Sequence, residues 1–387
     1  MIVPSVLDND LYVFSVSYVF FRNYPDAEGI FEFKDRNKEV YTPEFVKLLN
    51  EEIKSLSNLI LSDQEFKWLC EHIKYIPRVY FEWLRSFRYE QERVHVSLTE
   101  EGHLSLYIEG PIYKTMLYEV PLLAIISELV SKTKDYTITS DALLNRLIPK
   151  IELANEKNLM FSEFGTRRRH SFNTHDIVLE YIAKNSNTCV GTSNVYFAKK
   201  YDMTPIGTMN HAYIEFIGSQ YGYPLANQMA MDVWSDTYRG DLGTYLTDTY
   251  TTPIFFKNLD KMHALLFTGV RQDSGDEYKF TDRMIERYKE LGIDPRSKTI
   301  IFSNALDFPK FAKIAEYCEG KIGCAAGIGT NLTNDTGYPR PNIVIKLVRS
   351  KMNPKQTWRE CIKLSDDPGK HQGNQNEIEL CLKTLQL

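Results

Sequence analysis

Residues suited to binding ions follow short apolar runs throughout the middle of the chain. Arginine, hydroxyl-bearing side chains and the backbone N–H groups of glycine turns bind anionic oxygens, whereas clustered aspartates bind a hard cation. Such residues come directly after the apolar runs at 159–161, 188–190, 205–206, 244–246, 265–267, 299–302 and 322–325. The pattern predicts a site for a phosphorylated ligand together with Mg²⁺.

The first of these runs leads into an aromatic residue and three consecutive arginines. Phe164 and Arg167 belong to this segment, which ends at Arg169. A guanidinium group binds a carboxylate or phosphate through two parallel hydrogen bonds, and a neighbouring ring can stack on a planar ligand. A solvated basic loop is the alternative interpretation.

Two glycine-rich turns follow other runs. Thr192 and Ser193 lie in the first turn, and Gly327, Gly329 and Thr330 lie in the second. Glycine lets the backbone approach an anion closely, although most glycine turns only reverse the chain. We expect these two turns to bind anionic oxygens because both stand at strand exits.

His211 and several aspartates complete the set of candidate reactive groups. His211 could act as a general base or as a nucleophile toward a phosphoryl group, or it could be a hydrogen-bonded structural residue. Asp273 follows Arg271 by two positions, and Asp248 and Ser303 occupy similar places after apolar runs. The aspartates could hold Mg²⁺ on a pyrophosphate or bind ribose hydroxyls, or they could only cap helices.

Bringing these residues together requires a particular arrangement of elements. Apolar runs alternate with helical stretches from residue 121 to 340, which indicates βα units and a parallel sheet. In a closed barrel of such units the loops after the strands meet at one rim, where catalytic residues collect. Residues 1–120 mix helical and strand patterns and suggest a separate α+β domain, and an amphipathic strand at 343–348 suggests that residues 341–387 pack back on it.

The composition limits the class of protein. The chain has 387 residues, of which 43% are hydrophobic and 25% charged, as in ordinary globular proteins. Its formal net charge of −5 argues against sequence-independent binding to nucleic acid. It starts without the pattern of a signal peptide, has no apolar run long enough for a bilayer and has dispersed cysteines, so we expect a cytoplasmic protein with free thiols.

Several collinear strings resemble those of the nicotinate phosphoribosyltransferase family. The strings are FGTRRR at 164–169, VGTSN at 190–194, TPIGTMNH at 204–211, RQDSGD at 271–276, LGIDPRSKT at 291–299, GIGTNLT at 327–333, NIVIKLV at 342–348 and KLSDDPGK at 363–370. The resemblance extends from about residue 7 to residue 370. Because these strings occur in order, they are far more specific than any one motif.

The resemblance implies both an activity and a fold. Members of the family join nicotinate to 5-phosphoribosyl 1-pyrophosphate, giving nicotinate mononucleotide and pyrophosphate in NAD salvage. ATP is a co-substrate, and its hydrolysis is coupled through a phosphohistidine; Mg²⁺ is the implied metal. The implied fold is α/β, an irregular (β/α) barrel of the type II phosphoribosyltransferase kind with an N-terminal α+β domain. The implied assembly is a homodimer whose active sites are shared between the subunits.

The same resemblance assigns roles to individual residues. It makes His211 the phosphoacceptor and places Phe164 on one face of the pyridine ring and Tyr12, from the partner chain, on the other. Arg167 and Arg271 should bind the base and phosphate oxygens, and Asp273 the ribose and pyrophosphate. The remaining expected substrate contacts are Thr192, Ser193, Asp248, Ser303, Gly327, Gly329 and Thr330, of which the last three should cradle the 5′-phosphate. No side chain is assigned as a direct metal ligand.

Ser193 bears on the choice of base. The related nicotinamide enzyme has an aspartate at this position, which accepts a hydrogen bond from the amide and would repel a carboxylate. A serine hydroxyl can donate to a carboxylate, which favours nicotinate. Two alternatives stay open: an enzyme that uses nicotinamide or quinolinate, and a barrel that binds phosphorylated ligands without turnover. The chain also departs from the family pattern at Val13, Ala212 and Asn304.

Overall fold

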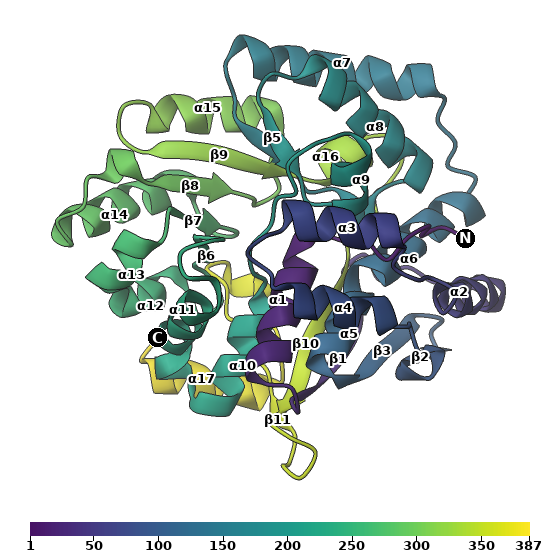
Figure 1. Ribbon diagram of the computed structural model, residues 1–387, viewed down its shortest axis with the longest axis horizontal. Helices are drawn as coiled ribbons and strands as arrows, with labels where there is room; N and C mark the ends of the chain where they lie inside the picture. Colours follow the sequence, from purple (N-terminus) through teal and green to yellow (C-terminus); the bar gives the residue numbers. More distant parts are fainter.

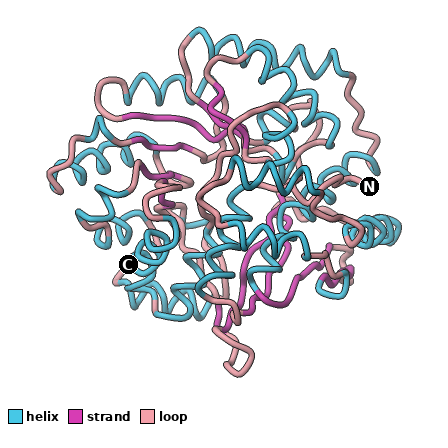
Figure 2. The backbone as a smooth tube through the Cα atoms, viewed as in Figure 1, coloured by secondary structure: helices cyan, strands magenta, loops and turns pink.

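Two separate β-sheets organise the molecule. The structure is a computed structural model that describes residues 1–387, apart from the side chain of Pro368. One sheet is parallel and the other antiparallel, and their strands form two distinct groups in the backbone view (Figure 2). The first helix of the chain lies between these two groups (Figure 1).

The parallel sheet carries the strand exits singled out in the sequence. Its order is β5-β4-β9-β8-β7-β6. The strands are β4 (Phe161–Glu163), β5 (Cys189–Thr192), β6 (Thr244–Leu246), β7 (Gly269–Gln272), β8 (Thr299–Phe302) and β9 (Gly323–Ile328). Every pairing is parallel, so all the loops that follow these strands open toward one side. This arrangement and the separate N-terminal elements confirm the predicted fold class.

Two of the seven predicted strands are wrong. Pro205 makes only an isolated parallel bridge with Thr192, in keeping with the lack of a proline N–H for a ladder. The run at 265–267 falls instead at the end of α13 (Lys261–Leu266), whose N-cap Asp260 accepts a hydrogen bond from the His263 N–H. Strand β7 begins only at Gly269, where a Cβ atom would lie 2.0 Å from the Thr299 carbonyl oxygen.

The antiparallel sheet joins the two ends of the chain. Its order is β11-β10-β1-β3-β2, with β1 (Glu28–Asp35), β2 (Val94–Leu98), β3 (Leu104–Pro111), β10 (Ile343–Lys351) and β11 (Arg359–Glu360). Strand β10 pairs with β1 along its length, from Glu28 opposite Lys351 to Asp35 opposite Ile343. The C-terminal segment thus completes a sheet begun by the N-terminal one, while the domain boundaries near 120 and 340 stay a prediction.

Helices cover both sheets. The helices around the parallel sheet are α7 (Ser140–Glu156), α8 (Phe172–Asn185), α9 (Val195–Lys200), α11 (Ala226–Tyr238), α12 (Thr252–Asn258), α13, α14 (Glu277–Glu290), α15 (Phe308–Cys318) and α16 (Thr330–Thr333) (Figure 1). Helix α10 (His211–Tyr221) instead packs on β10 of the antiparallel sheet. The others are α1 (Leu11–Asn23), α2 (Pro43–Leu56), α3 (Asp63–His72), α4 (Arg78–Ser86), α5 (Ile112–Thr115), α6 (Glu119–Thr133) and α17 (Gln375–Leu385).

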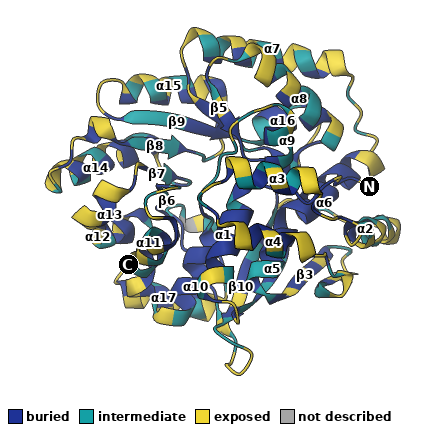
Figure 3. Cartoon of the chain, viewed as in Figure 1, coloured by how far each residue is buried: buried dark blue, intermediate teal, exposed yellow. Residues whose placement is uncertain are grey.

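Helices α1 and α6 form the centre of the molecule. Most of their residues are buried, and α1 is largely dark blue in the middle of Figure 3. Both helices are rich in apolar residues, as is typical of helices that are covered on most sides. Among the residues that the structure describes, no helix is long and apolar enough to cross a membrane.

The N-terminal segment is hydrogen-bonded to the loop after β5. The Leu11 N–H donates to the Ser193 carbonyl at 2.8 Å, and the Val195 N–H donates to the Asn9 carbonyl at 3.0 Å. Asp10 and Asn194 form an isolated antiparallel bridge. These bonds place the start of α1 at the strand-exit side of the parallel sheet.

A buried ion pair secures the same junction. Arg169 and Asp8 are both inaccessible to solvent, and the guanidinium donates to both carboxylate oxygens at 2.7 Å. Asn194 donates a further hydrogen bond to the Asp8 Oδ1 atom at 2.8 Å. Arg169, the third arginine of the triplet, therefore has a structural role. It neither binds a ligand phosphate nor lies in a solvated loop, so both interpretations from the sequence are wrong for this residue.

We expect Arg169→Met to destabilise the protein strongly, because it leaves the Asp8 carboxylate buried without a counter-charge. The expected loss in the free energy of unfolding is about 3–5 kcal/mol, measured by urea denaturation. Arg168→Met removes a neighbouring, partly exposed arginine and should cost about 1 kcal/mol or less. Equal losses in the two variants would contradict the role of the buried pair.

Candidate functional site

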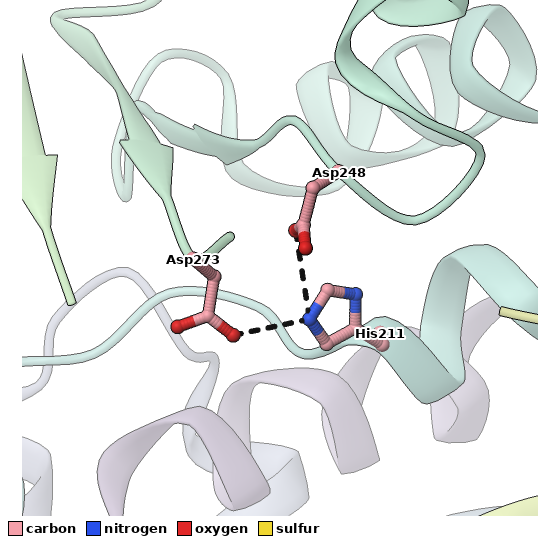
Figure 4. Close-up of side chains that lie close together, drawn as sticks. All are labelled: His211, Asp248 and Asp273. Carbon is pink, nitrogen blue, oxygen red and sulfur yellow. Dashed lines mark hydrogen bonds and ion pairs between the residues drawn. The ribbon is translucent and has the colours of Figure 1, made fainter. Parts of the chain in front are cut away.

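His211 lies between two strand exits of the parallel sheet. Asp248 follows β6 and Asp273 follows β7, and both carboxylates point toward the imidazole ring (Figure 4). The His211 Nε2 atom lies 3.3 Å from Asp273 Oδ2 and 3.7 Å from Asp248 Oδ1. The structure thus brings together three groups that are far apart in the sequence.

The imidazole of His211 is held in its neutral form. His211 is the first residue of α10, just after the N-cap Asn210, where the positive end of the helix dipole opposes a positive charge. Burial, followed by the nearby Lys363 ammonium, lowers the pKa of His211 to about 4. Its Nδ1 atom lies 3.0 Å from Thr249 Oγ1, and Lys363 Nζ lies 2.9 Å from Nε2. A neutral ring keeps a lone pair that can act as a nucleophile.

Each aspartate has its own cationic partner. Lys363 Nζ lies 3.3 Å from Asp248 Oδ2, which also accepts a hydrogen bond from the Ser274 hydroxyl at 2.6 Å. Arg271 Nη2 lies 3.1 Å from Asp273 Oδ1. Burial opposes ionisation of both carboxyls, but His211 and Lys363 near Asp248, and Arg271 near Asp273, hold the pKa of each below its usual range.

Ser303 links the exits of β7 and β8. Its hydroxyl donates to Asp273 Oδ1 at 2.6 Å and accepts from Arg271 Nε at 2.8 Å. These bonds fix the plane of the Arg271 guanidinium. Asn304, the next residue, accepts a hydrogen bond from the Lys370 ammonium at 3.2 Å.

An aromatic cavity opens beside this group. It has a volume of about 250 Å³, and its lining includes Tyr12, Phe164, Arg167, Ser193 and Arg271. A smaller cavity of about 60 Å³ is lined by residues that include Tyr12, Arg167, His211, Arg271 and Asp273. Because Tyr12, Arg167 and Arg271 line both cavities, a ligand in the larger one can reach the groups around His211.

Tyr12 corrects one expectation. The resemblance placed this residue in the site of a partner chain, but in the structure it lines the cavity of its own chain. The physical reason is the hydrogen-bonded junction between residues 9–11 and the loop after β5, which sets the first turn of α1 against the cavity. Tyr12, Phe164 and Arg167 therefore surround one cavity within a single chain.

The arginine triplet divides into three environments. Arg167 lines the cavity, with Glu119 Oε1 at 3.7 Å from its Nη1 atom. Burial opposes its charge, but the neighbouring Tyr12, Glu119 and Asp10 raise the pKa of Arg167. Arg168 contacts Asn342 Oδ1 at 3.3 Å, and Arg169 pairs with Asp8. Only the first arginine is available to a ligand in the cavity.

The two glycine turns also differ in role. Thr192 donates to the Glu163 carboxylate at 2.6 Å, and Glu163 lies 3.1 Å from His175 Nε2, so this hydroxyl belongs to a buried structural network. At Gly327 a Cβ atom would lie 2.4 Å from the Phe164 ring, and at Gly329 it would lie 2.8 Å from the Phe164 carbonyl oxygen. These glycines make room for Phe164, and their contact with a phosphate stays a prediction, as does that of Thr330 at the start of α16.

Several charged residues of the site were missed from the sequence. Lys346 on β10 and Glu119 at the start of α6 line the smaller cavity, and Lys363 contacts His211. Burial, then the Lys363 charge, lowers the pKa of Lys346 to about 8. Both lysines lie in strings that carried the family resemblance, and Lys346 is the one charged residue in the apolar stretch 343–348. That exception in an otherwise apolar strand was a signal that could have been used.

The carboxylates of the site fit Mg²⁺ better than the imidazole does. His211, Asp248 and Asp273 offer ligand atoms that all lie within 4.8 Å of one another. Asp248 Oδ1 is buried and has no hydrogen-bond partner among the described residues. Mg²⁺ prefers oxygen ligands and is usually held by one or two carboxylates together with substrate phosphates. The two aspartates match that preference, whereas the His211 nitrogen does not.

Comparison with known proteins gives consistent matches over the whole chain. Residues 159–386 match the nicotinate phosphoribosyltransferase (NAPRTase) family, and residues 7–127 match the nicotinate phosphoribosyltransferase N-terminal domain. The nicotinate phosphoribosyltransferase of Desulforapulum autotrophicum is 40% identical over 386 residues, covering 99% of each chain. That of Methanosarcina mazei is 39% identical, covering 98% of this chain and 97% of the relative.

Solved structures agree with these sequence matches. The crystal structure of nicotinate phosphoribosyltransferase from Porphyromonas gingivalis is 42% identical, covers 100% of both chains and superposes with a TM-score of 0.98. The enzyme from Vibrio cholerae is 30% identical and has a TM-score of 0.94, covering 100% of this chain and 94% of that one. With full-length agreement in both sequence and structure, this chain belongs to the nicotinate phosphoribosyltransferase family.

Proposed function

We propose that this chain joins nicotinate to 5-phosphoribosyl 1-pyrophosphate, releasing nicotinate mononucleotide and pyrophosphate, and couples the reaction to ATP hydrolysis through a phosphohistidine at His211. The observation that carries the proposal is the sharing of Arg167 and Arg271 by two adjoining cavities. One cavity has aromatic walls suited to a flat ring, and the other has the neutral imidazole and the two aspartates.

The larger cavity suits an acidic aromatic base. Phe164 and Tyr12 supply rings for stacking, and Arg167 supplies a cation for the carboxylate. The Arg271 guanidinium carbon lies 6.0 Å from the Phe164 ring centroid, so a base stacked on Phe164 lies beside Arg271. Such stacking fixes the ring nitrogen in an orientation for attack on the sugar.

The residues around Asp273 suit the activated sugar. Cleavage of the bond between ribose C1 and the pyrophosphate builds positive charge on the ribose and negative charge on the leaving group. Asp273 can stabilise the former, while Arg271 and Lys346 can stabilise the latter. Ser303 holds Arg271 and Asp273 in fixed positions. Gly327, Gly329 and Thr330 are assigned to the 5′-phosphate, and little proton transfer is needed.

Asp248 and Asp273 would hold Mg²⁺ together with the pyrophosphate oxygens. The ion would neutralise charge that develops on the leaving group. Asp248 is better suited than Asp273 to bind the ion, because its buried Oδ1 atom has no hydrogen-bond partner among the residues that the structure describes. Lys363 then balances the remaining charge of Asp248.

The setting of His211 favours its proposed role as phosphoacceptor. With Lys363 donating to Nε2, the neutral ring carries its proton on Nδ1 and donates it to Thr249. Lys363 and Lys346 provide positive charge next to the ring for incoming phosphates. A homodimer is also part of the proposal, although each chain supplies its own Tyr12 to the cavity.

The proposal is tested by assaying formation of nicotinate mononucleotide from nicotinate and 5-phosphoribosyl 1-pyrophosphate, with and without ATP and Mg²⁺. We expect turnover with nicotinate, stimulation by ATP and loss of activity when the metal is chelated. Nicotinamide and quinolinate, offered in parallel, should be poor substrates. Preference for either of them would change the assigned base, and saturable binding without pyrophosphate release would instead identify a non-catalytic binding protein.

His211→Ala should abolish ATP stimulation but leave some ATP-independent transfer. The variant removes the phosphoacceptor without touching Arg167, Arg271 or the aromatic walls. The measurement is the rate of nucleotide formation at saturating base with and without ATP. His72→Ala, an exposed histidine at the end of α3, is the control and should keep full stimulation. Undiminished ATP stimulation in His211→Ala would exclude the phosphohistidine.

Arg271→Ala should raise the reaction barrier by about 2–4 kcal/mol, by analogy with the removal of one oxyanion donor. The reason is the loss of a cation beside the leaving group and the freeing of Asp273 from its partner. The effect should fall on kcat and kcat/KM together. Arg283→Ala, on the exposed side of α14, should behave like the unaltered enzyme. A near-normal rate for Arg271→Ala would place this residue outside the reaction.

A further inference from the structure

The cavity assigned to the base contains a carboxyl group that its proposed ligand does not require. Asp10 lines this cavity and is 3% exposed. Its Oδ1 atom lies 2.7 Å from the Ser193 Oγ atom, and Ser193 lines the same cavity at 4% exposure. A ligand carboxylate bound there would meet a second carboxyl group through this serine.

Ser193 has little freedom except in the direction of its hydroxyl proton. Its N–H donates to the Glu163 carbonyl at 2.8 Å, and its carbonyl accepts from the Leu11 N–H at 2.8 Å. The backbone is therefore fixed from both sides. A serine hydroxyl has one proton to donate and lone pairs to accept with, so its bond to Asp10 decides which of these it offers to the cavity.

The protonation of Asp10 sets that choice. An ionised Asp10 accepts a hydrogen bond from the Ser193 hydroxyl. The lone pairs of Ser193 Oγ then face the cavity, where they repel a carboxylate but accept a hydrogen bond from an amide. A protonated Asp10 donates to Ser193 Oγ, and the Ser193 proton is then free for a carboxylate. Ser193 alone does not define the preference for nicotinate.

The charges around Asp10 favour the protonated form when an acidic base binds. From the packed elements, Asp10 faces Arg167 after β4, Glu163 on β4, Glu119 on α6 and Tyr12 on α1. In the ligand-free protein, the Arg167 guanidinium thus interacts with two buried carboxyl groups, those of Asp10 and Glu119. Burial raises the pKa of Asp10 against the opposing charge of Arg167, and it raises the pKa of Glu119 as well. A ligand carboxylate adds a further negative charge to the same guanidinium, which favours a proton on Asp10.

We propose that Asp10 is a specificity-determining residue for the base: it carries a proton when nicotinate is bound, turns the Ser193 hydroxyl toward the substrate carboxylate, and favours an amide in its place when ionised. The inference rests on the proposed function, because it assigns the larger cavity to the base. It predicts that nicotinate binding consumes a proton, whereas nicotinamide binding does not.

The test compares the pH dependence of two ligands in the same enzyme. We expect kcat/KM for nicotinate to fall by up to about tenfold per pH unit above the pKa of Asp10, as required when one proton is taken up on binding. The inhibition constant of nicotinamide should fall over the same range, since the ionised pair accepts from its amide. Ionisation of phosphoribosyl pyrophosphate affects both ligands alike and cannot produce opposite slopes. Parallel slopes for the two ligands would overturn the inference.

Asp10→Asn tests the residue directly. An asparagine amide can donate permanently to Ser193 Oγ, so we expect a flat nicotinate profile and weak nicotinamide inhibition across the whole range. Asp135→Asn is the matched control, because Asp135 is exposed after α6 and has a positive φ of 53° that asparagine accepts well. It should keep the unaltered profile, and an unaltered profile in Asp10→Asn would overturn the inference.

A double variant separates this role from a structural one. In the Ser193→Ala background, Asp10→Asn should have no further effect on the ratio of nicotinate to nicotinamide affinity, because the serine that transmits the effect is gone. Additive effects of the two substitutions would show that Asp10 acts independently of Ser193 and would contradict the inference. Lack of any nucleotide formation by the unaltered enzyme would instead overturn the proposed function itself.

Discussion

The buried Asp8 carboxylate is the contact on which the rest of the site depends. It receives two hydrogen bonds from Arg169 and one from Asn194, and so ties the N-terminal segment to the loops after β4 and β5. Charges this deeply buried are stable only when they are paired and fully hydrogen-bonded. The pair therefore fixes one position for the start of α1, and that position brings Asp10 and Tyr12 into the lining of the larger cavity of the same chain.

A second constraint is the balance of buried charge around His211. Lys363 and Arg271 each pair with one aspartate, and Lys346 and Arg167 face Glu119 and the smaller cavity. In the ligand-free protein, the carboxylates of Asp248, Asp273 and Glu119 partly neutralise the charges of these cations. Arg271 and Lys346 are carried by β7 and β10, and Arg167 follows β4, so the fold fixes the positions of these cations. The site is thus prepared for anions while staying compatible with a folded, ligand-free chain.

Much of the fold followed from local patterns. Strand β6 and strand β8 have the bounds that their apolar runs predicted. The failures at 205–206 and 265–267 have a common cause, since short apolar runs do not distinguish strands from helix ends or from isolated bridges. Among the site residues, Arg167, His211, Arg271 and Asp273 lie together as expected, whereas Thr192 is part of a structural network with Glu163.

The residue types at the strand exits can be read from the amino-acid sequence alone, because a strand and the turn after it are specified by neighbouring residues. The sequence also determined the family, through strings that keep their order along the chain. The contacts between distant residues appear only in the three-dimensional structure. Arg167 is the arginine of the triplet that lines the cavity, Tyr12 lines the cavity of its own chain, Lys363 contacts His211, and Ser193 is hydrogen-bonded to Asp10. These pairings join residues far apart in the chain, and they are set by burial and charge compensation, which act between segments and leave no local pattern in the sequence.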